Sequence, residues 1–151
     1  MAFQQALTHL ATISVTGITR QYGINEIPET LHRAQLPALL VMPIDTQSNA
    51  LFQESGGAFE AVAFSGGAQT VRYVLTHLLV IAPVTQGKGL REHLPTLISA
   101  IDHYIEALGA DVTLGDHLVY PAQIQIEPGI YSVGNRDYIG CAFRHRWIVA
   151  V

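Results

Sequence analysis

Hydrophobic and polar residues alternate along the last part of the chain, as they do in a β-strand with one packed face. From Tyr138 to Val151, one set of alternate positions is mainly apolar or aromatic, and the other set carries Arg144 and Arg146. A period of two places successive side chains on opposite faces of a sheet. We therefore predict a C-terminal strand with both arginines on the same face.

A second long run predicts the centre of the same sheet. Residues 70–83 are apolar on both faces toward the end of the run, which is typical of a central strand. Residues 58–64 precede it, and the intervening Ser-Gly-Gly-Ala at 65–68 suits the positive φ angles of a tight turn. These segments predict a long projecting β-hairpin.

Two shorter segments complete the predicted sheet. The apolar run between Pro37 and Pro43 is bounded by prolines and predicts a short buried strand. Near the other end, Ile124 and Ile126 alternate with polar residues, and a turn is expected at residues 134–135. The last two strands should thus form an antiparallel pair.

Two stretches repeat apolar residues at intervals of three and four, the spacing of one helix face. The first should end near Gly17, and the second lies between the break at residues 87–89 and Gly109, with Pro95 at a kink or a fresh first turn. The apolar positions are Phe3, Ala6, Leu7, Leu10 and Ile13 in the first, and Leu90, Leu94, Leu97, Ile98, Ile101, Ile105 and Leu108 in the second.

The predicted fold is α+β and forms a single domain over residues 1–151. A mixed, mainly antiparallel β-sheet with a long projecting hairpin packs against an N-terminal helix and one major helix. A chain of 151 residues is long enough to bury a core without disulfides or metals.

The amino-acid composition predicts that part of the protein surface is covered in an assembly. Hydrophobic residues make up 49% of the chain and charged residues only 13%, whereas about 25% charge is usual. The formal net charge of −4 argues against a dedicated nucleic-acid binder. The single cysteine, Cys141, cannot form an intrachain disulfide, and we expect a buried structural thiol. The apolar run of residues 74–84 is too short to span a bilayer, so no membrane partner is expected.

No motif predicts catalysis, a cofactor or a metal. The seven histidines contain no pair at helical spacing, and closed zinc sites normally show short-spaced ligand pairs. His77 and His145 are the pair of most interest, because both lie on strands that can be neighbours, and a cross-strand contact is expected. The repeated Ser-Gly-Gly-Ala lacks the lysine and helix of a phosphate-binding loop.

Two groups of residues are interface candidates. Three arginines on neighbouring strands can form a basic strip that meets phosphate or an acidic partner, although pairing with Glu54, Glu60, Glu127 or Asp137 is an equal alternative. Apolar and aromatic residues gather around the hairpin and its preceding loop, where they suit an interface arm. The candidates are Leu51, Phe52, Phe59, Phe64, Arg72, Arg144 and Arg146.

The order of elements, together with residues 36–41 (LPALLV), 72–80 (RYVLTHLLV) and 138–147 (YIGCAFRHRW), resembles the tail terminators of tailed bacteriophages, also called tail-completion or neck proteins. The resemblance implies a structural virion protein, assembled in the host cytoplasm, that forms a hexameric ring. Such a ring caps the tail tube, ends its polymerisation and joins it to the head connector. The implied partners are other copies of the chain, the tail tube protein, the sheath of a contractile tail and the connector or stopper protein, while DNA passes through without sequence-specific binding.

Two alternatives remain open at this point. A head-closure or stopper protein of the same neck would gate DNA. A small-molecule-binding α+β module unrelated to phage would use His77, His145 and Cys141 in a pocket, and would be a monomer or dimer.

Overall fold

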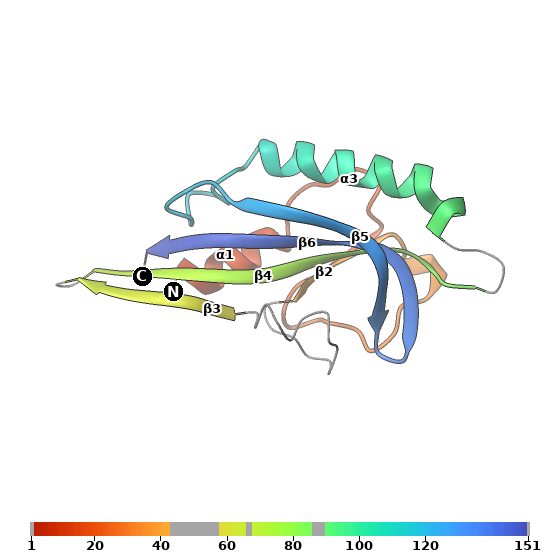
Figure 1. Ribbon diagram of the computed structural model, residues 1–151, viewed down its shortest axis with the longest axis horizontal. Helices are drawn as coiled ribbons and strands as arrows, with labels where there is room; N and C mark the ends of the chain where they lie inside the picture. The colour runs from red at the N-terminus through yellow and green to blue at the C-terminus, as the bar shows by residue number, and fades with distance from the viewer. Residues whose placement is uncertain (1, 43–57, 66–67, 86–89, 151) are drawn as a thin grey trace.

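The computed structural model describes residues 2–42, 58–65, 68–85 and 90–150 and has the expected α+β architecture. A mixed sheet is flanked by an N-terminal helix and one major helix (Figure 1). The elements are α1 (Ala2–Leu10), β1 (Arg20–Tyr22), the 3₁₀ turn η1 (Arg33–Gln35), β2 (Ala38–Met42), β3 (Ala58–Ser65), β4 (Ala68–Pro83), the 3₁₀ turn η2 (Leu90–His93), α3 (Leu94–Gly109), β5 (Gln123–Val133) and β6 (Arg136–Ala150).

Strand β4 is the centre of the sheet, as its apolar pattern predicts. One of its edges pairs with β6 in antiparallel register from Thr70 to Pro83. Its other edge is shared, because β3 pairs with the first half and β2 with the second. The order across the sheet is β1-β2-β4-β6-β5, and only the β1–β2 pair is parallel.

Strand β2 ends and strand β3 begins at nearly the same point along the edge of β4. Met42, at the end of β2, pairs with Thr76, and Ala58, at the start of β3, pairs with Val74. Residues 43–57 connect these two points and lie outside the described residues, so the expectations for Leu51 and Phe52 are not tested.

Strands β3 and β4 pair as an antiparallel ladder. Its register runs from Ala58 opposite Val74 to Ser65 opposite Ala68. The projection of this hairpin stays a prediction, because residues 66–67 at its turn lie outside the described residues. The structure describes the backbone of β3 only, so it does not place the side chains of Phe59 and Phe64.

One face of the sheet packs against both helices and forms the larger core. Alternate residues of β4 and β6 point to this helix face, where they meet the apolar residues of α1 and α3. In Figure 1, α1 lies behind the strands and α3 runs along the upper side of the view, where its Tyr104 stacks on Phe143 of β6. The largest buried side chains of this core are Leu10, Leu39, Tyr73, Leu75, Leu79, Tyr104, Phe143 and Trp147.

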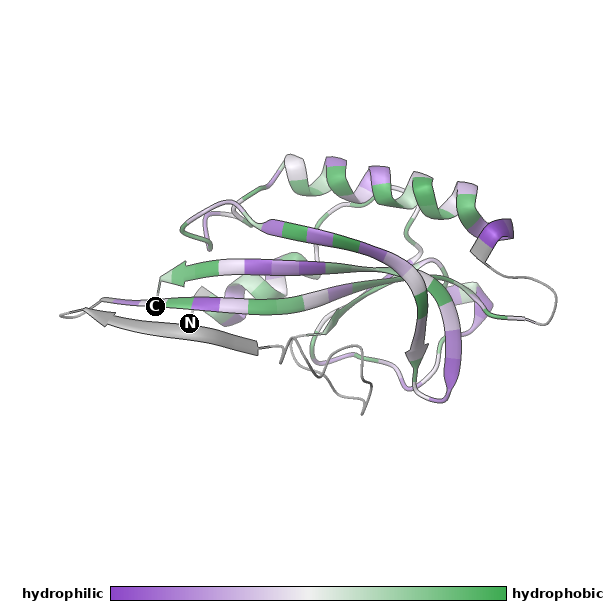
Figure 2. Cartoon of the chain, in the orientation of Figure 1, coloured by the Kyte–Doolittle hydropathy of each residue, from purple (hydrophilic) through white to green (hydrophobic). Residues whose placement is uncertain are grey.

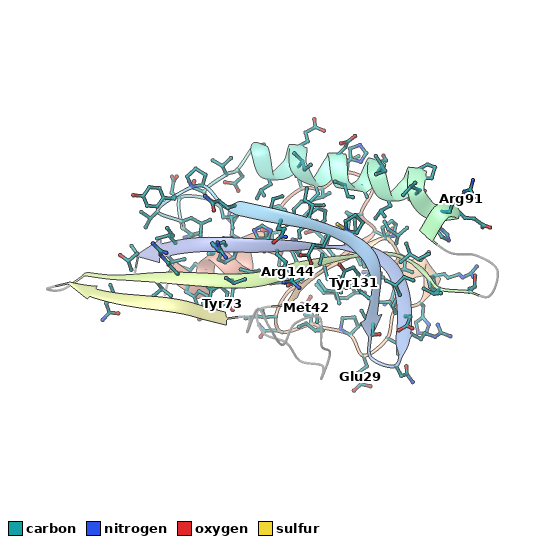
Figure 3. The ribbon with its side chains drawn as sticks, viewed as in Figure 1. Glu29, Met42, Tyr73, Arg91, Tyr131 and Arg144 are labelled. Carbon is teal, nitrogen blue, oxygen red and sulfur yellow. The ribbon has the colours of Figure 1, made fainter. Side chains whose placement is uncertain are left out.

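The opposite face has a smaller core under the connection from β1 to β2. Leu31, in the middle of this irregular segment, is fully buried against the sheet. The Tyr138 hydroxyl donates to the Leu31 carbonyl and accepts from the Leu31 amide, both at 3.0 Å. One side chain thus satisfies both backbone groups of a buried loop residue. Figure 3 shows Met42 and Tyr131, two further members of this cluster.

One helix boundary differs from the prediction, and one agrees with it. Helix α1 ends at Leu10 rather than near Gly17, although Ile13 is still buried. The run of buried apolar residues therefore extends beyond the last residue of the helix, which is why the pattern alone placed the helix end too late. Helix α3 begins at Leu94, and Pro95 lies in its first turn, where a missing amide proton is tolerated.

Strand β5 runs from Gln123 to Val133 and contains the predicted strand around Ile124 and Ile126, and the expected turn follows at Gly134. Gly134 has a φ of +64°, and a Cβ on it would lie 1.9 Å from the Glu29 carbonyl oxygen. The turn therefore requires glycine for both its conformation and its contact. Within the described residues, no helix is long and apolar enough to cross a membrane.

Gly140 of β6 lies directly against the backbone of β4. A Cβ on Gly140 would lie 1.9 Å from the Leu79 carbonyl oxygen, next to the register shift between Val80 and Ala82. We expect Gly140→Ala to lower the free energy of unfolding by about 1–3 kcal/mol or more, because backbone must move. Denaturant unfolding measures this change.

Gly109→Ala is the matched control, because nothing lies within 4 Å of a Cβ at that position. Alanine there should change stability by less than about 1 kcal/mol, and in the stabilising direction if it extends the helix. Equal stability of the two variants would contradict the close packing of β4 on β6.

Candidate functional site

Three of the predicted interface residues gather on one face of the sheet. On β4 and β6, Arg72 lies opposite Ile148, and Arg146 and Arg144 lie opposite the next two alternate positions of β4. All three side chains belong to the side of the sheet away from the helices, called here the open face. Figure 2 shows hydrophilic bands crossing β4, β5 and β6 in this region.

Arg144 is the most enclosed of the three. Its Nε atom lies 3.0 Å from Oε2 of Glu127 on the neighbouring strand β5, and both side chains are less than one-third exposed. The alternative of intramolecular pairing therefore holds for Arg144 (labelled in Figure 3), and Glu127 is the partner. Arg72 and Arg146 are exposed.

Arg72 and Arg146 line a pocket of about 520 Å³ at one end of the open face. Gln123 extends its polar lining, since it pairs with Arg146 across β5 and β6. Tyr120 and Ile148 supply apolar walls, and 61% of the Tyr120 side chain is exposed. Two guanidinium groups beside an aromatic ring suit a carboxylate or phosphate that arrives with apolar surface.

Helix α3 presents a second surface that the sequence did not assign correctly. The apolar stripe predicted to pack on the sheet is split between two sides of the helix. Leu97, Ala100, Tyr104 and Leu108 are buried. By contrast, Leu94 is 43% exposed, Ile98 is 51% exposed and Ile105 is 46% exposed. Residues one position apart on a helix face different directions, so both stripes cannot pack on the same sheet.

A chain of hydrogen bonds crosses the larger core. His77 Nδ1 is 2.8 Å from the Tyr104 hydroxyl, which is 2.6 Å from His145 Nε2, and Trp147 Nε1 is 3.1 Å from His145 Nδ1. All four residues are almost completely buried. His77 and His145 lie on neighbouring strands as expected, but Tyr104 bridges them.

The donor and acceptor atoms of these groups fix the direction of donation along this series of hydrogen bonds. Trp147 can only donate, so His145 Nδ1 accepts and the proton of neutral His145 lies on Nε2. His145 Nε2 then donates to Tyr104, and Tyr104 donates to Nδ1 of His77. The remaining proton of His77 lies on Nε2, which is buried and has no hydrogen-bond partner among the described residues.

Burial keeps the side chains of this hydrogen-bond network uncharged. It lowers the pKa of His145 from 6.5 to about 3, and it lowers the pKa of His77 well below 6.5, with a further contribution from His145. Burial also raises the pKa of Tyr104 well above 10.0. The chain therefore holds its protons in one fixed order at neutral pH, as a structural network does.

Cys141 is a buried structural thiol, as its solitary occurrence predicts. Its side chain is fully buried, and burial raises its pKa from 9.0 to about 12. A thiol is a weak nucleophile until it loses its proton. The three residues of the binding-module alternative, His77, Cys141 and His145, all lie in the larger core.

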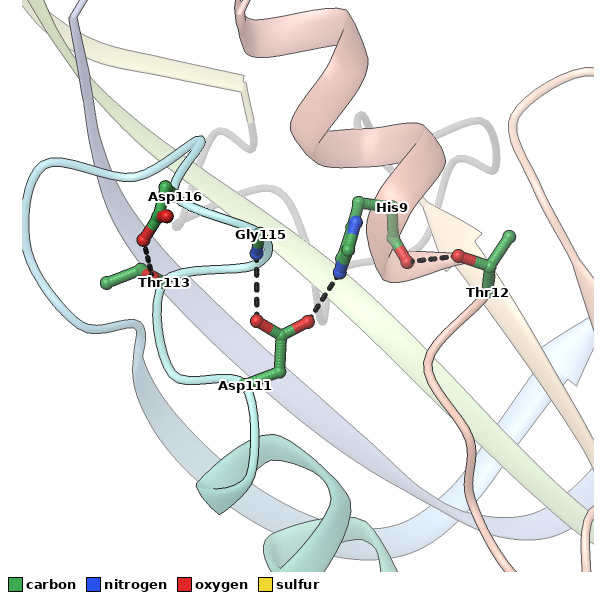
Figure 4. Close-up of polar contacts among 6 residues, drawn as sticks. All are labelled: His9, Thr12, Asp111, Thr113, Gly115 and Asp116. Atoms are coloured by element: carbon green, nitrogen blue, oxygen red, sulfur yellow. Dashed lines mark hydrogen bonds and ion pairs between the residues drawn. The ribbon is translucent and has the colours of Figure 1, made fainter.

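A separate polar contact ties the end of α1 to the segment after α3 (Figure 4). Asp111 accepts a hydrogen bond of 2.8 Å from the Gly115 amide and pairs with Nε2 of His9. The Gly115 amide, followed by the His9 ring, lowers the pKa of Asp111 below 3.8. Across the described part of the chain, no group of three or more metal-ligating side chains is placed to hold an ion.

Sequence reasoning missed Tyr104, although a signal was present. Leu97, Tyr104 and Leu108 recur at intervals of seven and four, so the tyrosine belongs to a helical stripe. Its hydroxyl partners come from strands 27 and 41 residues away in the sequence, and no local pattern identifies them.

The chain matches no protein-family model and no curated protein sequence.

Tyr104→Phe tests the buried chain directly. Loss of the hydroxyl leaves Nε2 of His145 and Nδ1 of His77 without a partner, so we expect a loss of about 1–3 kcal/mol in the free energy of unfolding. Tyr120→Phe is the control, because that side chain is 61% exposed and its change should stay within about 0.5 kcal/mol. If both variants are equally stable by denaturant unfolding, the hydroxyl does not support the core.

The two buried histidines also predict how stability depends on pH. In the unfolded chain they protonate as pH falls below 6.5, whereas in the folded chain they stay neutral down to much lower pH, about 3 for His145. The unfolded state then binds more protons, so their stabilisation is complete above pH 6.5 and is lost as pH falls from there toward about 3. Each histidine should contribute a slope of about 1.4 kcal/mol per pH unit.

Denaturant unfolding between about pH 7 and pH 5 measures this slope. His145→Gln keeps an acceptor for Trp147 and a donor for Tyr104 but does not titrate, so it should reduce the slope by the contribution of one proton. An unchanged slope in this variant would mean that His145 takes up protons in the folded protein.

Proposed function

We propose that this chain is a tail terminator of a tailed bacteriophage, a structural subunit that forms a hexameric ring on the end of the tail tube. The observation that carries the proposal is the exposed apolar stripe of Leu94, Ile98 and Ile105 on α3. Exposed apolar residues clustered on one element are typical of an interaction surface.

The order of elements supports the same assignment. An N-terminal helix precedes an early buried strand, and a paired β3–β4 ladder, one major helix and a closing antiparallel pair follow. This is the order on which the resemblance to tail terminators rests. The low charged fraction of 13% also suits a subunit whose surface is partly covered by its neighbours.

The proposed mechanism is geometric. A contact between two different patches generates a ring if the rotation closes and a filament if it does not. A closed ring on the end of a tube no longer offers the repeat of the tube, so polymerisation ends there. The opposite side of the ring is then available to the connector or stopper protein of the head, and DNA passes through the centre.

The proposed ring predicts the mass of the protein in solution. Light scattering should give six times the chain mass of 16.4 kDa, and negative-stain images should show rings with a central hole. Ile98→Asp should abolish the ring but keep the fold, because it places a charge on an exposed apolar contact.

Ser99→Asp is the matched control. It adds the same charge at the next exposed position of α3 and should leave the ring intact. Equal effects of the two variants would argue that the stripe is not the contact surface. A stable wild-type monomer or dimer would contradict the proposed hexamer.

A further inference from the structure

We propose that neighbouring copies meet head to tail, with the acidic, apolar surface of α3 on one copy seated against the arginine pocket of the next. This inference rests on the proposed ring and specifies its contact. Two different patches form such an interface, each complementary to the other in charge and in apolar character.

The receiving patch is the pocket on the open face. Arg72 and Arg146 supply two positive charges at exposed positions of neighbouring strands. Arg144 lies further along the same face, outside the pocket, where it pairs with Glu127 at 3.0 Å. Tyr120 and Ile148 provide apolar area beside the two exposed cations.

The docking patch is the exposed side of α3. Asp102 and Glu106 are exposed and four residues apart, so they lie on one side of the helix. Helix α3 contains no lysine or arginine, which leaves both acidic charges unbalanced on their own element. Asp102 lies four residues after Ile98 and three before Ile105, both exposed, so the acidic pair borders the apolar stripe.

A second copy of the chain is the occupant that fits both patches. Each patch combines two like charges with exposed apolar side chains, and the signs of the two patches are opposite. Opposite potentials across an interface favour the correct partner and disfavour contact between two identical patches. The two patches lie on different elements, one on α3 and the other on the paired strands β4 and β6, as a contact between two different patches requires.

Charge exchange tests this contact. The sheet variant carries Arg72→Glu and Arg146→Glu, and the helix variant carries Asp102→Lys and Glu106→Lys. Each variant alone places like charges across every interface, so the ring should be lost in light scattering and negative-stain images. An equimolar mixture places opposite charges at every contact of an alternating ring, so the six-subunit mass should return.

Two control variants change the charge by the same amount outside both patches. Arg33→Glu with Arg136→Glu, and Glu26→Lys with Glu29→Lys, alter exposed residues and should leave the ring unchanged. Circular dichroism establishes that each variant is folded. If a reversed variant does not fold, Arg72→Gln with Arg146→Gln, or Asp102→Asn with Glu106→Asn, replaces it and should raise the protein concentration needed for assembly.

The outcomes separate this contact from the ring itself. Restored assembly in the mixture supports the head-to-tail contact. Rings in either reversed variant alone, or no assembly in the mixture, overturn the contact and leave the ring standing. A wild-type protein that stays monomeric overturns both the ring and the contact, and a wild-type protein that stops at a dimer overturns the ring. Binding of a DNA duplex that is lost in a sheet variant with intact rings would assign the pocket to phosphate and also overturn the contact.

Discussion

The antiparallel pairing of β4 with β6 is the constraint on which the rest of the structure depends. It runs from Thr70 to Pro83 and sets, residue by residue, which side chains of two long strands share a face. The aromatic and aliphatic residues of one set form the core under the helices, and the arginines of the other set form the open face. A shift of one residue would exchange the two sets, placing Arg146 in the core and Trp147 in solvent. The close contact at Gly140 lies at one end of this ladder, where the register shifts.

The strands were predictable from the sequence because their pattern is local. Alternation in β6 identified both its packed set and the face of Arg144 and Arg146, and the apolar run of β4 identified the central strand. Helix α3 was also predictable, but its orientation was not. Leu97 and Ile98 both belong to aliphatic stripes of helical spacing, and the choice between them depends on Tyr104, whose ring stacks on Phe143 at a centroid distance of 3.7 Å. That contact joins distant parts of the chain.

The candidate site was likewise predictable only where it depends on a local pattern. The three arginines could be assigned to one face from strand alternation, but the pairing of Arg144 with Glu127 depends on the register of β5. The pocket needs Tyr120, which comes from the irregular segment before β5, where no periodicity indicates position. The buried chain through Tyr104 has a different character from these surface groups. Its donors and acceptors match in only one order, so it favours one packing of α3 on the sheet over other apolar packings of similar area.

The shared edge of β4 has a consequence for how this fold can vary. Strands β2 and β3 end and begin opposite Thr76 and Val74, so the two ends of residues 43–57 are held roughly 7 Å apart by a third strand. The sheet fixes this gap whatever the length of the segment that crosses it. Because the entropy of closing a loop rises only slowly with its length, segments of different size and composition can be exchanged here without changing the register of any strand. Insertions and deletions at this point would therefore leave the pairing of β2, β3 and β4 unchanged.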